Sequence, residues 1–194
     1  MDDPRTEHLR RALTAARDAM RWKLEGLSEY DARRPLTPTG SNVLGVVKHV
    51  ASVELGYLGD VFGRPSGVPL PWLAPDAEPN ADMWVPPEES RQSVLRLLDA
   101  AAATTEGTLA ALDLDAPGEV PWWGPNRRRV TLHEIAVHMI AESHRHAGHV
   151  DVLRELVDGQ AGYRADNDNL APGDATWWAD YVARVRAAAD RCRD

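Results

Sequence analysis

Apolar residues recur every three or four positions along several long segments of the chain, a spacing that predicts amphipathic α-helices. In the first segment, Leu9, Leu13, Met20 and Leu24 form one stripe. The expected helices cover about residues 6–27, 39–62, 86–112 and 131–158, with a shorter helix over about 174–191. No segment shows the convincing alternation of apolar and polar residues that a strand would give. The pattern therefore predicts an all-α protein.

The ends of the expected helices carry their own signals. Thr131 and Glu134 have the spacing of a capping box, and Gly159 suits the left-handed end of the same helix. The prolines and glutamates at 86–89 are typical of a first helical turn, because proline lacks a donor there and acids face the positive end of the helix. We therefore expect helices to begin at about residues 86 and 131.

Two long loops, at 63–85 and 113–130, separate the expected helices and are rich in proline and tryptophan. Proline removes a backbone donor and clashes with the preceding turn, so neither loop can be helical throughout. Their arginine and tryptophan side chains either line the mouth of a site or pin the loops to the helices: Arg64, Trp72, Trp84, Trp122 and Trp123. We expect a four-helix bundle with an additional short C-terminal helix, folded as a single domain over residues 1–194.

Composition and charge narrow the classes of partner. The 194 residues are 43% hydrophobic and carry a formal net charge of −8, which allows one core and gives no basic footprint for nucleic acid or anionic lipid. No apolar run reaches the ~18 residues of a membrane span, and the acidic N-terminus does not resemble a signal peptide, so we expect a cytoplasmic protein. The one cysteine, Cys192, lies near the C-terminus, so sulfur chemistry would use a thiol from elsewhere.

Four of the seven histidines lie within the twelve residues from 138 to 149. At about 100° per residue, four ionisable side chains share a face with the apolar residues of this helix: His138, Glu142, His146 and His149. His144 falls on the opposite side and is expected to face water. Burial of such groups without partners costs several kcal/mol, so a partner must satisfy them.

A metal ion is one such partner. His138, Glu142 and His146 follow one another at intervals of four residues, and three in a row span about 12 Å, so no more than two of them can share an ion. A further ligand is expected from the second helix, where His49 lies at the edge of the apolar face and Glu54 inside it. A histidine from one helix and a histidine–glutamate pair from another suit Zn²⁺ or another divalent ion. A purely structural glutamate–histidine network is the alternative.

Three segments also carry a family resemblance: GSNVLGVVKHVASVELGYLGDVFGRP at 40–65, ADMWVPPEES at 81–90, and HMIAESHRHAGHVDVLRELVDG at 138–159. With RWKLEGLSEYDARRPL at 21–36, they resemble the DinB-like superfamily, in the branch of mycothiol-dependent enzymes and the N-terminal bundle of maleylpyruvate isomerases. The resemblance implies a four-helix bundle that holds a divalent metal ion.

The same resemblance implies which residues hold the ion. His49 matches the histidine of the second helix, and Glu142 and His146 match the pair on the later helix. Many relatives have histidine at the position of Glu142 and glutamine at that of His149. His138, His149 and Glu54 are left as candidates for proton transfer or for orienting a ligand. Zn²⁺ is the first choice of metal, with Ni²⁺, Mn²⁺ and Fe²⁺ as alternatives.

The resemblance further implies a partner thiol, mycothiol, and an electrophilic substrate to which the thiol is transferred or which it isomerises. A homodimer is compatible with it. Two alternatives stay open: hydrolysis by metal-activated water, and a non-catalytic, stress-associated bundle that retains a metal site. The need for an added thiol separates the first alternative from a thiol-dependent enzyme.

Overall fold

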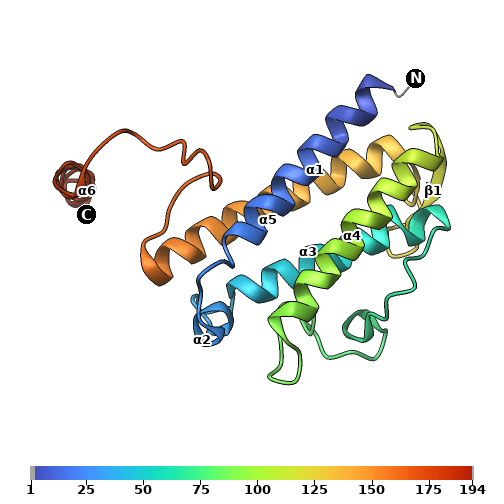
Figure 1. The fold of residues 1–194 in the computed structure, drawn as a ribbon, viewed down its shortest axis with the longest axis horizontal. Helices are drawn as coiled ribbons and strands as arrows, with labels where there is room; N and C mark the ends of the chain where they lie inside the picture. Colours follow the sequence, from blue (N-terminus) through green and yellow to red (C-terminus); the bar gives the residue numbers. More distant parts are fainter. Residues whose placement is uncertain (1–2, 194) are drawn as a thin grey trace.

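Helices form most of the computed structural model, which describes residues 3–193 (Figure 1). The four long ones are α1 (Pro4–Trp22), α3 (Val43–Leu58), α4 (Arg91–Ala111) and α5 (Leu132–Asp158). The shorter ones are α2 (Glu29–Arg33), α6 (Ala175–Asp190) and the 3-10 turns η1 (Asp60–Phe62) and η2 (Pro71–Leu73). The prediction of an all-α fold with an additional C-terminal helix is confirmed.

The four long helices pack as a bundle around a shared interior. α3 packs against both α4 and α5, and α1 packs against α5 and α4. Each of the four contributes side chains that are no more than 1% exposed, among them Leu13, Val50, Leu98 and Met139. Burial of these apolar stripes is the main stabilising contribution to such a bundle. The apolar periodicity of the sequence thus identified the helices that form the core.

The predicted ends of α5 are confirmed. The Thr131 side chain accepts a hydrogen bond from the backbone N–H of Glu134, and the Glu134 carboxylate accepts one from the Thr131 N–H. Gly159 ends the helix with a φ of 78°, in the left-handed region where glycine is free of strain. The helix that carries most of the candidate site therefore has both ends fixed by its own sequence.

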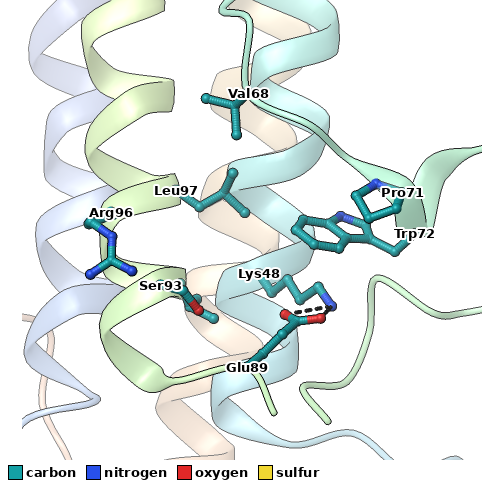
Figure 2. Close-up of a pocket in the computed structure, with 9 residues that line it drawn as sticks. Lys48, Val68, Pro71, Trp72, Glu89, Ser93, Arg96 and Leu97 are labelled. Atoms are coloured by element: carbon teal, nitrogen blue, oxygen red, sulfur yellow. Dashed lines mark hydrogen bonds and ion pairs between the residues drawn. The ribbon is translucent and has the colours of Figure 1, made fainter.

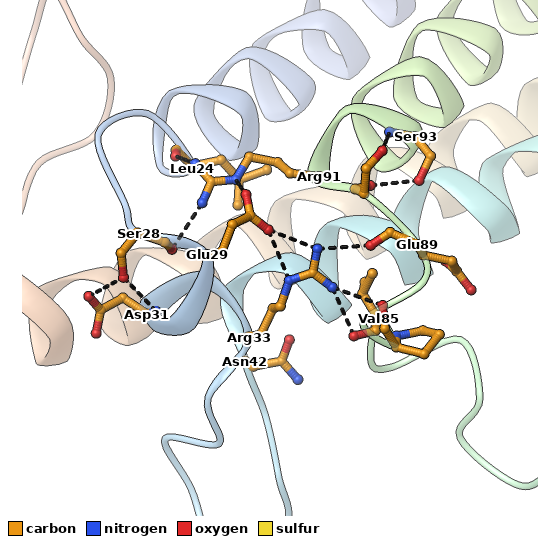
Figure 3. A network of polar contacts seen from close by, with 12 residues as sticks. Leu24, Ser28, Glu29, Asp31, Arg33, Asn42, Val85, Glu89, Arg91 and Ser93 are labelled. Atoms are coloured by element: carbon orange, nitrogen blue, oxygen red, sulfur yellow. Dashed lines mark hydrogen bonds and ion pairs between the residues drawn. The ribbon is translucent and has the colours of Figure 1, made fainter.

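The start predicted for α4 is wrong. The helix begins at Arg91, with Ser90 as its N-cap, and residues 86–89 form an irregular turn before it. Figure 3 shows the reason: the Arg33 guanidinium donates hydrogen bonds to backbone carbonyl oxygens within that turn. These carbonyls are satisfied from outside the helix, so the turn has an alternative to helical hydrogen bonding.

Two short strands and the end of α1 differ from what the sequence pattern predicts. Strand β1 (Pro117–Glu119) pairs antiparallel with β2 (Arg129–Thr131), and α1 ends at Trp22, earlier than expected. Strands of three residues are too short to show an alternation of apolar and polar positions. The small hairpin leads directly into α5 and brings residues 120–128 to that end of the bundle.

The loop at 81–85 lies directly against α3. A Cβ atom added to Gly45 would lie 1.9 Å from the carbonyl oxygen of Met83, so only glycine permits this approach. The Asn42 side chain donates to the same carbonyl at 3.2 Å. This contact fixes the loop beside the helix that carries His49.

The C-terminal segment differs from the bundle. α6 has no buried residue, and in Figure 1 it lies apart from the four long helices. Its aromatic side chains contact one another, with the rings of Trp177 and Tyr181 stacked at 5.4 Å. The single domain over residues 1–194 stays a prediction. No helix in the described part of the chain is long and apolar enough to cross a membrane.

Candidate metal centre

Three of the sequence-predicted ligands meet between α3 and α5. The imidazole rings of His49 and His146 lie 4.9 Å apart between centroids, at an angle of 61°. The Glu142 Oε1 atom lies 3.0 Å from His146 Nε2 and 3.7 Å from His49 Nε2. All three side chains are partly buried, and one donor atom from each lies within 4.8 Å of the other two. The structure therefore brings together the residues that the sequence placed on two separate helices.

Asp82 supports the cluster from behind His49, and the sequence pattern did not predict this role. Its Oδ2 atom lies 2.6 Å from His49 Nδ1. With Nδ1 donating to this carboxylate, the lone pair of His49 is on Nε2, the nitrogen nearest Glu142. Asp82 lies in the irregular loop, where helical periodicity gives no signal, although it is part of the ADMW run that carries the family resemblance.

Lys48 holds the loop in place from inside the bundle. Its side chain is 1% exposed, and its ammonium donates to the carbonyl oxygens of Ala81 and Trp84, on either side of Asp82. It also pairs with Glu89 at 3.1 Å, as Figure 2 shows. The position of Asp82 is thus set by α3 itself, through a buried cation.

A cavity of about 510 Å³ lies beside Lys48, lined mainly by apolar side chains of α4 and the loop before it (Figure 2). Trp72 forms one wall, with its indole N–H donating to Ser52 Oγ at 2.8 Å and the Lys48 ammonium 4.0 Å from its ring centroid. None of the three donor residues lines this cavity. Trp72 therefore pins its loop to α3, and the cavity is separate from the candidate metal centre.

The donor set fits a divalent ion. Two imidazole nitrogens and one carboxylate oxygen are ligands that Zn²⁺ and similar ions accept. Two ligands at ~2.1 Å in a tetrahedral site lie about 3.4 Å apart, and the separations of 3.0 and 3.7 Å from Glu142 bracket that value. Among the described residues, Glu142 has no lysine or arginine partner that would neutralise it. An ion held by three such ligands would keep coordination positions open.

Burial favours the ligand form of His146. Desolvation lowers the pKa of His146 below its ordinary value and the nearby His49 lowers it further, while Glu142 opposes both effects. An imidazole binds a metal ion only when it is neutral. The surroundings of His146 therefore favour the protonation state that a ligand needs.

The structure corrects two expected orientations on α5. His149 is exposed rather than inward, with Nδ1 3.4 Å from His146 Nδ1. His144 does not face water: it is partly buried, and its Nε2 lies 3.0 Å from the carbonyl oxygen of Ala12 on α1. The reason is that both α1 and α3 pack against α5. The buried face of α5 therefore includes small residues such as Ala147, and it is wider than the face marked by the large apolar residues alone and centred differently.

The remaining two candidates lie outside the donor cluster. His138 is partly buried between the rings of Tyr57 and Trp123, with centroid distances of 4.8 and 5.2 Å. Glu54 is fully buried, and its partners are Arg17 on α1 and Thr105 on α4. The carboxylate beside His49 is that of Asp82, not that of Glu54.

Comparisons with known proteins agree with this architecture. The crystal structure of a conserved protein from Enterococcus faecalis is similar to this one, with a TM-score of 0.59 and 18% sequence identity over 82% of this chain and 99% of the other. At that identity the likeness shows the fold alone. No curated protein matches the sequence. The sequence profile described as mycothiol-S-transferase matches residues 8–159, which include most of α1, all of α2 to α5 and all the candidate ligands. The chain therefore belongs to the mycothiol-S-transferase family.

Proposed function

We propose that the protein is a divalent-metal-dependent S-transferase that joins mycothiol to an electrophilic small molecule. His49, Glu142 and His146 are the proposed ligands. The observation that carries the proposal is the convergence of these three donors, with Asp82 behind His49 and no competing cation, in a member of this family. Zn²⁺ is the expected ion, and Ni²⁺, Mn²⁺ and Fe²⁺ accept the same ligands.

The chemistry needs a thiolate at neutral pH, and a divalent cation bound there would stabilise one. In the overall reaction, the sulfur forms a bond to the electrophilic carbon, the leaving group departs with its bonding pair, and the thiol proton passes to solvent. The chain's one cysteine, Cys192, is exposed and follows α6, so the nucleophile in this proposal is external.

The residues around the ligands have proposed roles in the same step. Asp82 holds the His49 ring with Nε2 toward the site. His149 is exposed and adjoins His146, a position from which it can pass a proton to water. Within residues 3–193, the His138 ring nitrogens have no hydrogen-bond partner, and His138 lies one turn from Glu142, so it is the second candidate for proton transfer.

The test uses the full chain, purified without a histidine tag. Metal content is measured first, and conjugate formation is then followed with mycothiol and an alkylating electrophile, before and after removal of the metal. We expect about one ion per chain and conjugation that is lost on metal removal and restored by Zn²⁺. Turnover of an ester or amide without thiol would indicate a hydrolase instead. Metal binding without any use of thiol would indicate the non-catalytic bundle, and a chain that binds none of the four ions would overturn the site.

A further inference from the structure

The interface between α3 and α5 contains two ring contacts in the same register. The ring of His49 on α3 contacts that of His146 on α5. The ring of Tyr57, eight residues later on α3, contacts that of His138, eight residues earlier on α5. Eight helical residues span about 12 Å. Glu142 lies halfway between the two contacts on α5 and is partly exposed. The candidate metal centre therefore has an aromatic neighbour along the same helix–helix boundary.

The aromatic cluster, defined here as Tyr57, Trp122, Trp123 and His138, is fixed by hydrogen bonds. The Tyr57 hydroxyl accepts one bond from the Trp122 indole N–H at 3.1 Å and another from the Trp123 indole N–H at 3.0 Å. The Trp122 ring also lies against α3, since a Cβ atom at Gly56 would be 3.6 Å from its outermost carbon. Two adjacent tryptophans of one loop are thus locked onto a single side chain of α3.

Trp122 is nevertheless 55% exposed. A large apolar ring left in water contributes little to the fold, whereas a ring held in one orientation loses little further conformational freedom when a ligand stacks on it. His138 lies edge-on to Tyr57 and Trp123, and its ring nitrogens have no hydrogen-bond partner in any interaction described for residues 3–193. The cluster therefore combines a fixed apolar surface with a free polar edge.

The charge near the cluster restricts what can bind. Aromatic clusters also attract cations, but the Arg127 guanidinium already lies over the Trp123 ring, at 5.4 Å from its centroid. A second cation would be repelled there. An electron-poor aromatic ring is attracted by the electron-rich indole faces, and electronegative substituents at its edge, such as nitro oxygens, are attracted by the guanidinium.

We propose that the aromatic cluster is the binding subsite for the electrophile and that it selects flat, electron-poor aromatic compounds. This inference rests on the proposed function for the identity of the reaction, and on the geometry of the cluster for the ligand. His138 of this cluster lies one turn from Glu142 on α5, so the cluster adjoins the candidate metal centre along the α3–α5 boundary. Trp122 is then a binding residue, and Tyr57 is a positioning residue that acts through the two indoles.

The first arm of the test measures binding alone, without metal or thiol. Full-length protein is titrated with 1,3-dinitrobenzene, an electron-poor ring without a leaving group, while the indole N–H signals are followed by NMR. We expect the signals of Trp122 and Trp123 to shift and saturate, and Trp122→Ala to weaken binding about tenfold, as the loss of one stacked ring would. Trp177→Ala, a change at a tryptophan of α6, is the control and should bind as the wild type does.

The second arm compares two electrophiles in the presence of mycothiol and metal: 1-chloro-2,4-dinitrobenzene, which is aromatic, and 2-chloroacetamide, which is not. We expect Trp122→Ala to lower the ratio of kcat/KM for the aromatic over the aliphatic compound about tenfold, mainly through KM. An unchanged ratio, shifts confined to other tryptophans, or tighter binding of phenyltrimethylammonium than of dinitrobenzene would overturn the proposal. Because the first arm needs no turnover, dinitrobenzene binding without any conjugation would contradict the proposed function and leave the subsite standing.

Discussion

Two glutamates on inward-facing positions of the bundle have opposite surroundings. Glu54 is fully buried, accepts a hydrogen bond from Thr105 at 2.5 Å and lies 2.9 Å from the Arg17 guanidinium. Glu142 has 30% of its side chain exposed, and its partners are two imidazoles. The Glu54 carboxylate is neutralised by the Arg17 guanidinium, whereas the Glu142 carboxylate has no lysine or arginine partner among the described residues.

The comparison teaches how to separate stabilising from ligand-binding charges. A buried carboxylate with a guanidinium and a hydroxyl has its hydrogen-bonding capacity filled from within the protein. A partly exposed carboxylate that lies beside two imidazole nitrogens has ligand atoms left over, which is what a metal site needs. The two glutamates differ in burial, but the charge of their neighbours is what separates the stabilising carboxylate from the one that can bind a ligand.

The largest effect is expected at the buried cluster of Glu54, Arg17 and Thr105. Glu54→Ala would leave the Arg17 guanidinium buried without its partner, and we expect the free energy of unfolding to fall by about 3–5 kcal/mol in urea titrations. Glu155→Ala, at an exposed position of α5, should change it by no more than ~0.5 kcal/mol. A loss below ~1 kcal/mol for Glu54→Ala would contradict the interpretation that Glu54 stabilises the fold by neutralising the buried Arg17. Metal content per folded chain should stay unchanged.

The next effect concerns the candidate metal centre of His49, Glu142 and His146. His146→Ala removes one of three proposed ligands, so we expect Zn²⁺ affinity to fall by at least ~100-fold in calorimetric titrations, the upper end of what residues behind the ligands cause. His144→Ala, two residues away, removes the bond to the Ala12 carbonyl instead and should lower stability by about 0.5–1.5 kcal/mol without changing the affinity. Equal affinities in both variants would remove His146 from the site.

A smaller effect is expected from the residue behind His49. Asp82→Ala leaves the ligands in place but frees the His49 ring to rotate and change tautomer, and we expect Zn²⁺ affinity to fall about 10–100-fold. Asp76→Ala, at an exposed position earlier in the same loop, is the matched control. If both variants bind Zn²⁺ equally well, the hydrogen bond between Asp82 and His49 does not support the metal.

The sequence was most informative where helical geometry decides the outcome. The four long helices, the capping of α5 and the pairing of Glu142 with His146 one turn apart all follow from local spacing. The nearness of His49 to that pair depends on how α3 and α5 pack, and it was expected from the inward ionisable residues and from the family resemblance.

Other features depend on tertiary contacts that spacing does not contain. Asp82 reaches the site because its loop lies against Gly45, and a loop path cannot be read from periodicity. His144 and His149 were assigned to the wrong surroundings because two helices, not one, cover α5. Glu54 is explained by Arg17, which lies 37 positions earlier in the chain.

The attachment of the 81–85 loop to α3 has a mechanical consequence. Through Asn42, Gly45 and Lys48, this loop is fastened to the helix that carries His49, so a histidine and its supporting carboxylate form one rigid part. The other two donors belong to α5. An ion held by both parts would act as a reversible cross-link between the two helices, and its concentration would then set how firmly this bundle stays closed.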